Sequence, residues 1–151
     1  MAAPQSGRAD YPRFAMIDTR WKDNDVYGHV NNVEYYSYFD SVINRYLIRE
    51  GGLNIHGGPV IGLCVRSECQ YHAPLAFPDQ VEAGLRVARL GRSSVQYAIG
   101  LFREGEDAPA AEGGFVHVFV DRATRRPVPL EGALRAALAA LHVPEREEPG
   151  S

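Results

Sequence analysis

The sequence predicts an α+β protein in which one curved antiparallel sheet wraps around a long central helix, followed by a short C-terminal helix. Two observations lead to this prediction. A three- and four-residue recurrence of apolar side chains occurs once at length, between Val33 and Leu47, whereas the later chain mostly alternates with a period of two. Turns of hairpin composition join the alternating segments, and strands linked in that way are antiparallel. One long helix is therefore available to cover one sheet.

The first elements follow from these patterns in chain order. Residues 14–21 form a short, mixed segment that suits a first strand. The long helix begins at Val33 and ends at the glycine pair Gly51-Gly52, because glycine commonly follows the last helical residue. Its aromatic side chains spread beyond a single stripe, which indicates a helix that is mostly enclosed.

Four strands are expected after the helix, following one another as hairpins. The first covers residues 61–71, and its alternation assigns the side chains to two faces. One face carries Ile61, Leu63, Val65, Ser67, Cys69 and Tyr71, and the other carries Arg66, Glu68 and Gln70. The remaining strands cover residues 81–87, 95–101 and 115–120, and an Ala/Leu-rich helix covers residues 130–141.

Length and composition indicate one globular domain. The chain has 151 residues, of which 45% are hydrophobic and 23% charged, and a chain of this size can bury a core without a metal or disulfide. We assign the domain to residues 13–143, with a flexible N-terminal arm over residues 1–12 and a flexible C-terminal tail over residues 144–151.

Charge and hydropathy argue against several classes of protein. The net charge of -3, without any run of Lys or Arg, argues against a nucleic-acid partner. No segment has the apolar character of a signal peptide or the length of a membrane span, so we expect no membrane insertion. Cys64 and Cys69 lie an odd number of residues apart on one strand, which would place them on opposite faces. Two free thiols are typical of the reducing cytoplasm.

The histidines and glycines form no cofactor pattern. The histidines lack metal-ligand spacing, and His117, within an apolar strand, is expected to be a hydrogen-bonded core residue. The glycine-rich stretches match no phosphate-binding motif, and the chain has no serine nucleophile elbow. We therefore expect no metal ion and no organic cofactor.

Polar residues crowd the entrance to the long helix in WKDNDVYGHVNNVEYYSYFD, residues 21–40. The pattern D-x-Y-x-H-V-N-N-x-x-Y runs from Asp25 to Tyr35, and a Tyr71–Pro74 step and the stretch FVDRATRRPVPL occur further on. With these motifs the chain resembles the hotdog-fold acyl-CoA thioesterases, the 4-hydroxybenzoyl-CoA thioesterase-like family. Within it, the chain looks most like the long-chain acyl-CoA thioesterase branch. The resemblance spans about residues 14–142 and implies a hotdog fold.

The resemblance implies that Asp25 is the catalytic carboxylate, as general base or as nucleophile. It also implies that the amide of Asn32, at the helix start where backbone N–H groups are unpaired, binds the oxyanion. Asp25 could instead accept hydrogen bonds in an Asx-type turn or cap the helix. His29 is a general acid or a positioning residue, and Asn31 and Asn32 can fix the loop by side-chain hydrogen bonds. Asp23 is interpreted as a solvated loop acid.

In this family, coenzyme A often contacts basic and hydroxyl residues around the turn between the middle strands. Arginine suits phosphate because of its fork of donors. A soluble turn with charged tips is the alternative explanation of the same residues. The corresponding positions here are Arg89, Arg92, Ser93 and Ser94.

The aromatic helix offers Tyr35, Tyr36 and Phe39 as candidates for an acyl pocket, with core packing as the alternative. The strand over residues 61–71 could pair with its copy in a second chain and so cover an exposed edge. We expect a homodimer, and we leave open a tetramer built as a dimer of dimers.

The expected function is hydrolysis of a fatty or aryl acyl-CoA to the free acid and coenzyme A, in lipid metabolism. One alternative is a non-catalytic acyl-CoA-binding protein, because fold does not imply function. A second is a thioesterase that acts on acyl carrier protein, although an acidic carrier would need a basic docking face that the net charge of -3 does not indicate. Hydration of an enoyl thioester is disfavoured, since it normally uses a catalytic His in a different motif.

Overall fold

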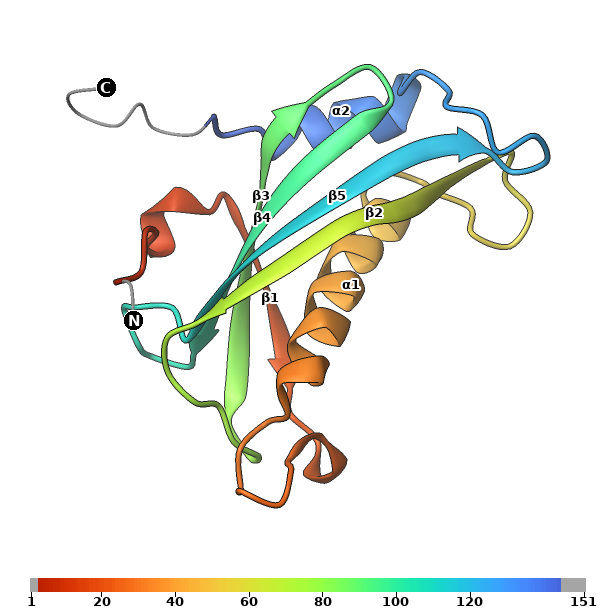
Figure 1. Ribbon diagram of the computed structural model, residues 1–151. Helices are drawn as coiled ribbons and strands as arrows, with labels where there is room; N and C mark the ends of the chain where they lie inside the picture. Colours follow the sequence, from red (N-terminus) through yellow and green to blue (C-terminus); the bar gives the residue numbers. More distant parts are fainter. Residues whose placement is uncertain (1–2, 145–151) are drawn as a thin grey trace.

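The computed structural model describes residues 3–144, where two α-helices and five antiparallel strands occur (Figure 1). This arrangement confirms the predicted α+β class and the order of a strand, a long helix, four strands and a short helix. Of the predicted C-terminal tail, residues 145–151 lie outside the described part of the chain. The elements are β1 (Arg13–Asp18), α1 (Asn32–Arg49), β2 (Val60–Tyr71), β3 (Gln80–Leu90), β4 (Ser94–Arg103), β5 (Ala111–Asp121) and α2 (Gly132–Ala140), with 3₁₀ turns η1 (Arg8–Asp10) and η2 (Trp21–Asp23).

The strand order in the sheet is β1-β3-β4-β5-β2, so β1 and β2 form its two edges. The hairpins β3-β4 and β4-β5 are as predicted. The hairpin expected between β2 and β3 is wrong, because β2 pairs with β5 instead. After Tyr71 the chain crosses the end of the sheet, where the N–H groups of His72 and Ala73 both bond to the Ala110 carbonyl.

Helix α1 lies against one face of the sheet (Figure 1), and its central residues Phe39, Ile43 and Leu47 have no exposed surface. Phe39 packs directly on β5 at Gly113. A Cβ atom at Gly113 would lie 2.4 Å from the Phe39 ring, so only glycine permits this approach of helix and strand. The glycine-rich stretch in β5 therefore serves helix packing.

A β-bulge in β2 changes the predicted assignment of its faces. The register with β5 shifts between Cys64 and Arg66, which leaves Val65 as the extra residue. The residues of β2 that share the α1-facing side are consequently Gly62, Cys64, Ser67, Cys69 and Tyr71. Their partners in β5 are, in the same order, Phe119, His117, Phe115, Gly113 and Ala111. The predicted grouping of Ile61 and Leu63 with Ser67 is therefore wrong. Cys64 and Cys69 lie on the same face, contrary to the prediction, and both are free thiols.

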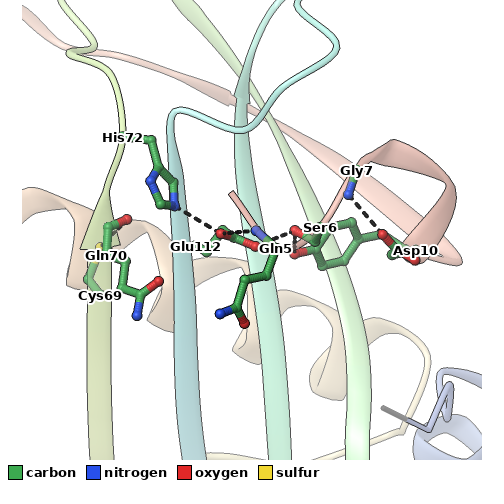
Figure 2. A network of polar contacts seen from close by, with 9 residues as sticks. Gln5, Ser6, Gly7, Asp10, Cys69, Gln70, His72 and Glu112 are labelled. Carbon is green, nitrogen blue, oxygen red and sulfur yellow. Dashed lines mark hydrogen bonds and ion pairs between the residues drawn. The ribbon is translucent and has the colours of Figure 1, made fainter. Parts of the chain in front are cut away.

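The N-terminal arm contacts the opposite face of the sheet. Figure 2 shows the Glu112 carboxylate between His72 and the arm, where it accepts hydrogen bonds from the Gln5 N–H and the Ser6 hydroxyl at 2.9 and 2.6 Å. The Ser6 hydroxyl also lies 2.8 Å from that of Tyr11, whose ring is buried against the sheet. These contacts hold residues 5–11 against the sheet. A static structure does not measure motion, so the flexibility of the arm stays a prediction.

His117 is a hydrogen-bonded core residue, as predicted. Its ring is buried beside Phe115 and Phe119, and its Nδ1 lies 3.1 Å from the Tyr97 hydroxyl. Burial lowers the pKa of His117 to about 4, so the ring is neutral near pH 7.

Candidate active site

The loop between η2 and α1 folds back on itself and carries the predicted catalytic carboxylate. Asn24 and Val30 form an isolated antiparallel bridge, and the Asp25 N–H donates to the His29 carbonyl at 2.9 Å. Gly28 closes the turn with a φ of 81°, which glycine adopts without strain. Because this turn ends at Val30, Asp25 is held close to the start of α1.

The Asp25 side chain is half-buried, and one of its oxygens is used locally. Its Oδ1 accepts a hydrogen bond of 2.9 Å from the Tyr27 N–H, so the Asx-type turn considered from the sequence is present. Across residues 3–144, no hydrogen-bond donor meets the second carboxylate oxygen. An Asx turn and a catalytic role are compatible here, since the second oxygen stays available to a ligand.

The first turn of α1 includes the Asn32 N–H, the donor predicted to bind the oxyanion. Asn31 caps the helix, as its Oδ1 accepts from the Val33 N–H at 3.0 Å and its carbonyl accepts from the Glu34 N–H at 2.9 Å. The Asn31 N–H itself donates to the Asp23 carbonyl at 2.8 Å. No acceptor in the described residues meets the Asn32 N–H. This N–H lies at the positive end of an 18-residue helix and can bind an anionic oxygen.

Tyr71, at the end of β2, contacts the same first turn. Its hydroxyl donates to the Asn32 carbonyl at 3.1 Å, and its ring packs edge-on against Tyr35 with centroids 4.9 Å apart. Burial, together with the neighbouring Cys69 and Tyr36, raises the pKa of Tyr71, so the hydroxyl keeps its proton. Burial also raises the pKa of the Cys69 thiol to about 11, which makes it a poor nucleophile near neutral pH.

Asp23 is a buried structural acid, which corrects the interpretation of this residue as a solvated loop acid. Its carboxylate has no exposed surface and pairs with the Arg20 guanidinium at 2.9 Å. It also accepts hydrogen bonds from the Tyr38 hydroxyl at 2.8 Å and from the Arg20 N–H at 2.9 Å. Burial opposes the charge of Asp23, but these hydrogen bonds outweigh it and hold the pKa below its usual range. No local pattern indicates this burial, because the partner Tyr38 is 15 residues away.

His29 is exposed at the far side of the turn. Its carbonyl holds the turn through the Asp25 N–H, and within residues 3–144 its imidazole makes no hydrogen bond or ion pair. This contact involves the backbone alone, so the positioning and general-acid roles of the His29 side chain both stay predictions.

The residues predicted to bind coenzyme A lie at the other end of the sheet. Loop 72–79 touches the Asp25 turn through the bond from the Val30 N–H to the Leu75 carbonyl, whereas the β3-β4 turn lies beside α2 (Figure 1). The 11 residues of β3 separate these two ends by about 33 Å at roughly 3.3 Å per residue. A single chain therefore does not bring Asp25 together with Arg89, Arg92, Ser93 and Ser94.

The proposed acyl-pocket residues differ in burial. Phe39 and Tyr35 are buried in the core, and Tyr36 is half-buried beside Phe39. The core-packing alternative thus describes Phe39 well.

A cleft of about 560 Å³ opens at the other end of α1, between residues 51–60 and 128–134, and Asn32 does not line it.

Two further features of the structure concern a membrane and a metal ion as possible partners. None of the helices within residues 3–144 is both long and apolar enough to span a membrane. Among the same residues, no group of three or more His, Cys, Asp and Glu side chains has a metal-binding arrangement.

A five-stranded antiparallel sheet on one long helix, with a second short helix, is the hotdog fold. The family model of the Thioesterase-like superfamily matches residues 19–138, and the chain belongs to this superfamily. No curated protein matches the chain.

Solved structures of relatives agree with this assignment. The PA5185 protein of Pseudomonas aeruginosa strain PAO1 is 58% identical, with a TM-score of 0.90 over 93% of this chain and 97% of that one. The PA2801 protein of Pseudomonas aeruginosa is 32% identical, with a TM-score of 0.76 over 82% and 95%. A thioesterase from Thermus thermophilus, complexed with coenzyme A and Zn, is 33% identical, with a TM-score of 0.71 over 87% and 95%.

Proposed function

We propose that the protein hydrolyses the thioester of a fatty or aryl acyl-CoA to a carboxylic acid and coenzyme A. The observation that carries this proposal is the unpaired Asn32 N–H at the start of α1, together with the Asp25 carboxylate in the adjoining turn. Thioester hydrolysis needs an activated oxygen nucleophile and a donor for the oxyanion, and these two groups supply one each.

Asp25 can act in two ways that give the same products. As a general base, it takes a proton from water while the water oxygen bonds to the thioester carbon. As a nucleophile, its free oxygen bonds to that carbon and forms an anhydride, which water then hydrolyses. In both routes the carbonyl oxygen becomes an oxyanion held by the Asn32 N–H. The C–S bond then breaks, and the thiolate takes up a proton.

The relatives support coenzyme A as the leaving group. The Thermus thermophilus thioesterase was solved with coenzyme A, and it is 33% identical to this chain. The assignment to the 4-hydroxybenzoyl-CoA thioesterase-like family and its long-chain branch is part of the same proposal. Two free cysteines, neither in a disulfide, are the basis for placing the protein in the cytoplasm.

The active unit in this proposal is a homodimer formed through β2. This edge strand exposes Leu63 and Val65, at 36% and 59%, and an exposed apolar edge is normally covered in a native protein. The turn before α1 exposes more apolar surface, with Val26 at 95% and Tyr27 at 83%. A second copy that pairs with β2 would cover Leu63 and Val65. It would also extend toward Val26 and Tyr27 in the turn before α1.

Such a dimer also gives the predicted coenzyme A residues a place near the thioester. Antiparallel pairing of two β2 strands reverses the direction of the second sheet. The partner's β3-β4 turn then lies at the same end of the joint sheet as Asp25. Arg89 and Arg92 would therefore serve the site of the other protomer, and a tetramer would arise by association of two such dimers.

The test is a substrate panel on the purified protein, with released thiol as the readout. We expect turnover of acyl-CoAs, and weaker turnover of the same acyl groups on acyl carrier protein at matched concentration. Turnover of the carrier-bound thioesters alone would replace the substrate class. Tight acyl-CoA binding without thiol release would support the alternative of a non-catalytic binding protein.

A further inference from the structure

A smaller cleft of about 250 Å³ lies between the edge strand β1 and the C-terminal half of α1. One wall is formed by β1, and the other by residues of α1 that lie three or four positions apart. Leu85 of β3 also lines the cleft. The lining residues are Arg13, Phe14, Ala15, Met16, Val42, Arg45, Tyr46, Arg49 and Leu85.

Three arginines and no acidic side chain line this cleft. Arg13 lies over the Tyr46 ring, 5.0 Å from its centroid, and pairs with Glu50 at 3.0 Å just outside the lining. Arg45 and Arg49 make no ion pair or side-chain hydrogen bond with any described residue. The cleft thus carries an excess of positive charge that the protein itself does not neutralise.

Helix stability explains only one of the two arginines that α1 contributes. Arg49 lies in the last turn of α1, where a cation favours the helix dipole. Arg45, four residues earlier, gains little from that effect and repels Arg49, because like charges at this spacing are unfavourable. Both side chains nevertheless line the same cleft.

The rest of the cleft is apolar and held in place. Leu85, Val42 and Tyr46 are buried, and the Tyr46 hydroxyl donates to the Ala137 carbonyl of α2 at 2.6 Å. A rigid apolar surface beneath arginine forks matches a ligand that has a hydrocarbon part and an anionic head.

We infer that this cleft binds an amphipathic anion, a carboxylate or phosphate attached to a short apolar chain. Arg45 and Arg49 bind the anionic head, and Val42, Tyr46 and Leu85 hold the apolar part. The site is separate from the candidate active site, since the 13 residues from Asn32 to Arg45 span about 20 Å of helix. It also lies beside β1, the edge opposite β2, and so stays open in the proposed dimer.

The inference is tested by NMR titration of the full ¹⁵N-labelled chain with hexanoate and with hexyl phosphate, using hexanol as the neutral control. We expect saturable shifts of the Ala15, Val42 and Arg45 amides with the anions. Arg45→Gln/Arg49→Gln should weaken binding at least tenfold. Arg125→Gln/Arg126→Gln removes the same charge from two exposed residues outside the cleft and should bind like wild type.

The relative affinity of the two anions identifies the head group, carboxylate or phosphate. Binding that survives in Arg45→Gln/Arg49→Gln would overturn the inference. The inference would also be wrong if hexanol caused the same amide shifts as the anions, or if the amides that shift lay in another part of the chain. None of these measurements depends on thioesterase activity, so this inference and the proposed function can fail independently.

Discussion

The Tyr71 hydroxyl donates a hydrogen bond of 3.1 Å to the Asn32 carbonyl and so joins the edge strand β2 to the first residue of α1. The Asn32 N–H, in turn, meets no acceptor within residues 3–144. The strand proposed to form the dimer therefore contacts the residue whose N–H is proposed to bind the oxyanion. This contact makes Tyr71 a positioning residue whose effect can be measured.

Tyr71→Phe should lower kcat by roughly 2- to 10-fold with little change in KM, because it removes one hydrogen bond worth about 0.5–1.5 kcal/mol. The ring contact with Tyr35 is kept, so the fold should persist. Steady-state kinetics on an acyl-CoA substrate provide the measurement. Tyr27→Phe is the matched control, since its exposed ring lies in the neighbouring turn. Equal kcat for wild type and Tyr71→Phe would remove this role.

Asp23→Asn should destabilise the protein by about 1–3 kcal/mol near pH 7, since the buried carboxylate loses its charged hydrogen bonds to Arg20 and Tyr38. The lowered pKa of Asp23 means that its contribution is complete above the unfolded value of about 3.9. The contribution is lost as the pH falls below 4 through the folded value. Urea unfolding at pH 7 and pH 3 should therefore show a smaller difference from wild type at pH 3. An equal difference at both pH values would contradict the assignment.

Gly113→Ala should cost about 1–3 kcal/mol of stability, because the new Cβ would lie 2.4 Å from the Phe39 ring in the core. Gly114→Ala is the control on the other face, where the nearest atom, at 2.9 Å, is the mobile carboxylate of Glu68. Thermal unfolding of both variants measures the difference. Adding Phe39→Leu should recover part of the loss in Gly113→Ala. Similar melting temperatures for the two alanine variants would be evidence against this packing.

Val65→Lys should convert the dimer to a monomer, since it places a charge on the exposed bulge of β2. Light scattering after size exclusion measures the change. Met16→Lys adds the same charge on the other edge strand, at a residue that is 44% exposed, and should leave the dimer intact. Loss of thioesterase activity in the Val65→Lys monomer alone would support a site shared between protomers. A wild-type protein that is monomeric at micromolar concentration would exclude the proposed dimer.

Periodicity predicted the elements of the fold because each pattern is local. The helical spacing from Val33 to Leu47 and the two-residue alternation of the strands both follow from burial on one face. The pairing of β2 with β5 and the bulge at Val65 depend on contacts far along the chain, and no local signal encoded them. A single inserted residue was enough to reverse the predicted faces of Ile61 and Leu63.

In the candidate site too, features set by the local sequence could be predicted, and features set by distant contacts could not. A side-chain hydrogen bond from Asn31 and an Asx-type turn at Asp25 could both be predicted from residue type and position before the helix, whereas the helix cap, for which Asp25 was the candidate, is Asn31. The burial of Asp23 and the contact from Tyr71 to Asn32 depend on residues 15 and 39 positions away. Such tertiary contacts decide which polar groups stay available for chemistry, and they become visible only in three dimensions.

The most direct test of the thioesterase proposal is the rate of acyl-CoA hydrolysis by Asp25→Asn. Asparagine can still accept the hydrogen bond from the Tyr27 N–H, so the turn should keep its shape while the base or nucleophile is lost. Asp18→Asn, an exposed carboxylate at the end of β1, is the matched control. We predict that Asp25→Asn lowers kcat by roughly 10²–10⁴ and that the control is unchanged. Near-wild-type turnover by a folded Asp25→Asn protein would contradict the proposed mechanism.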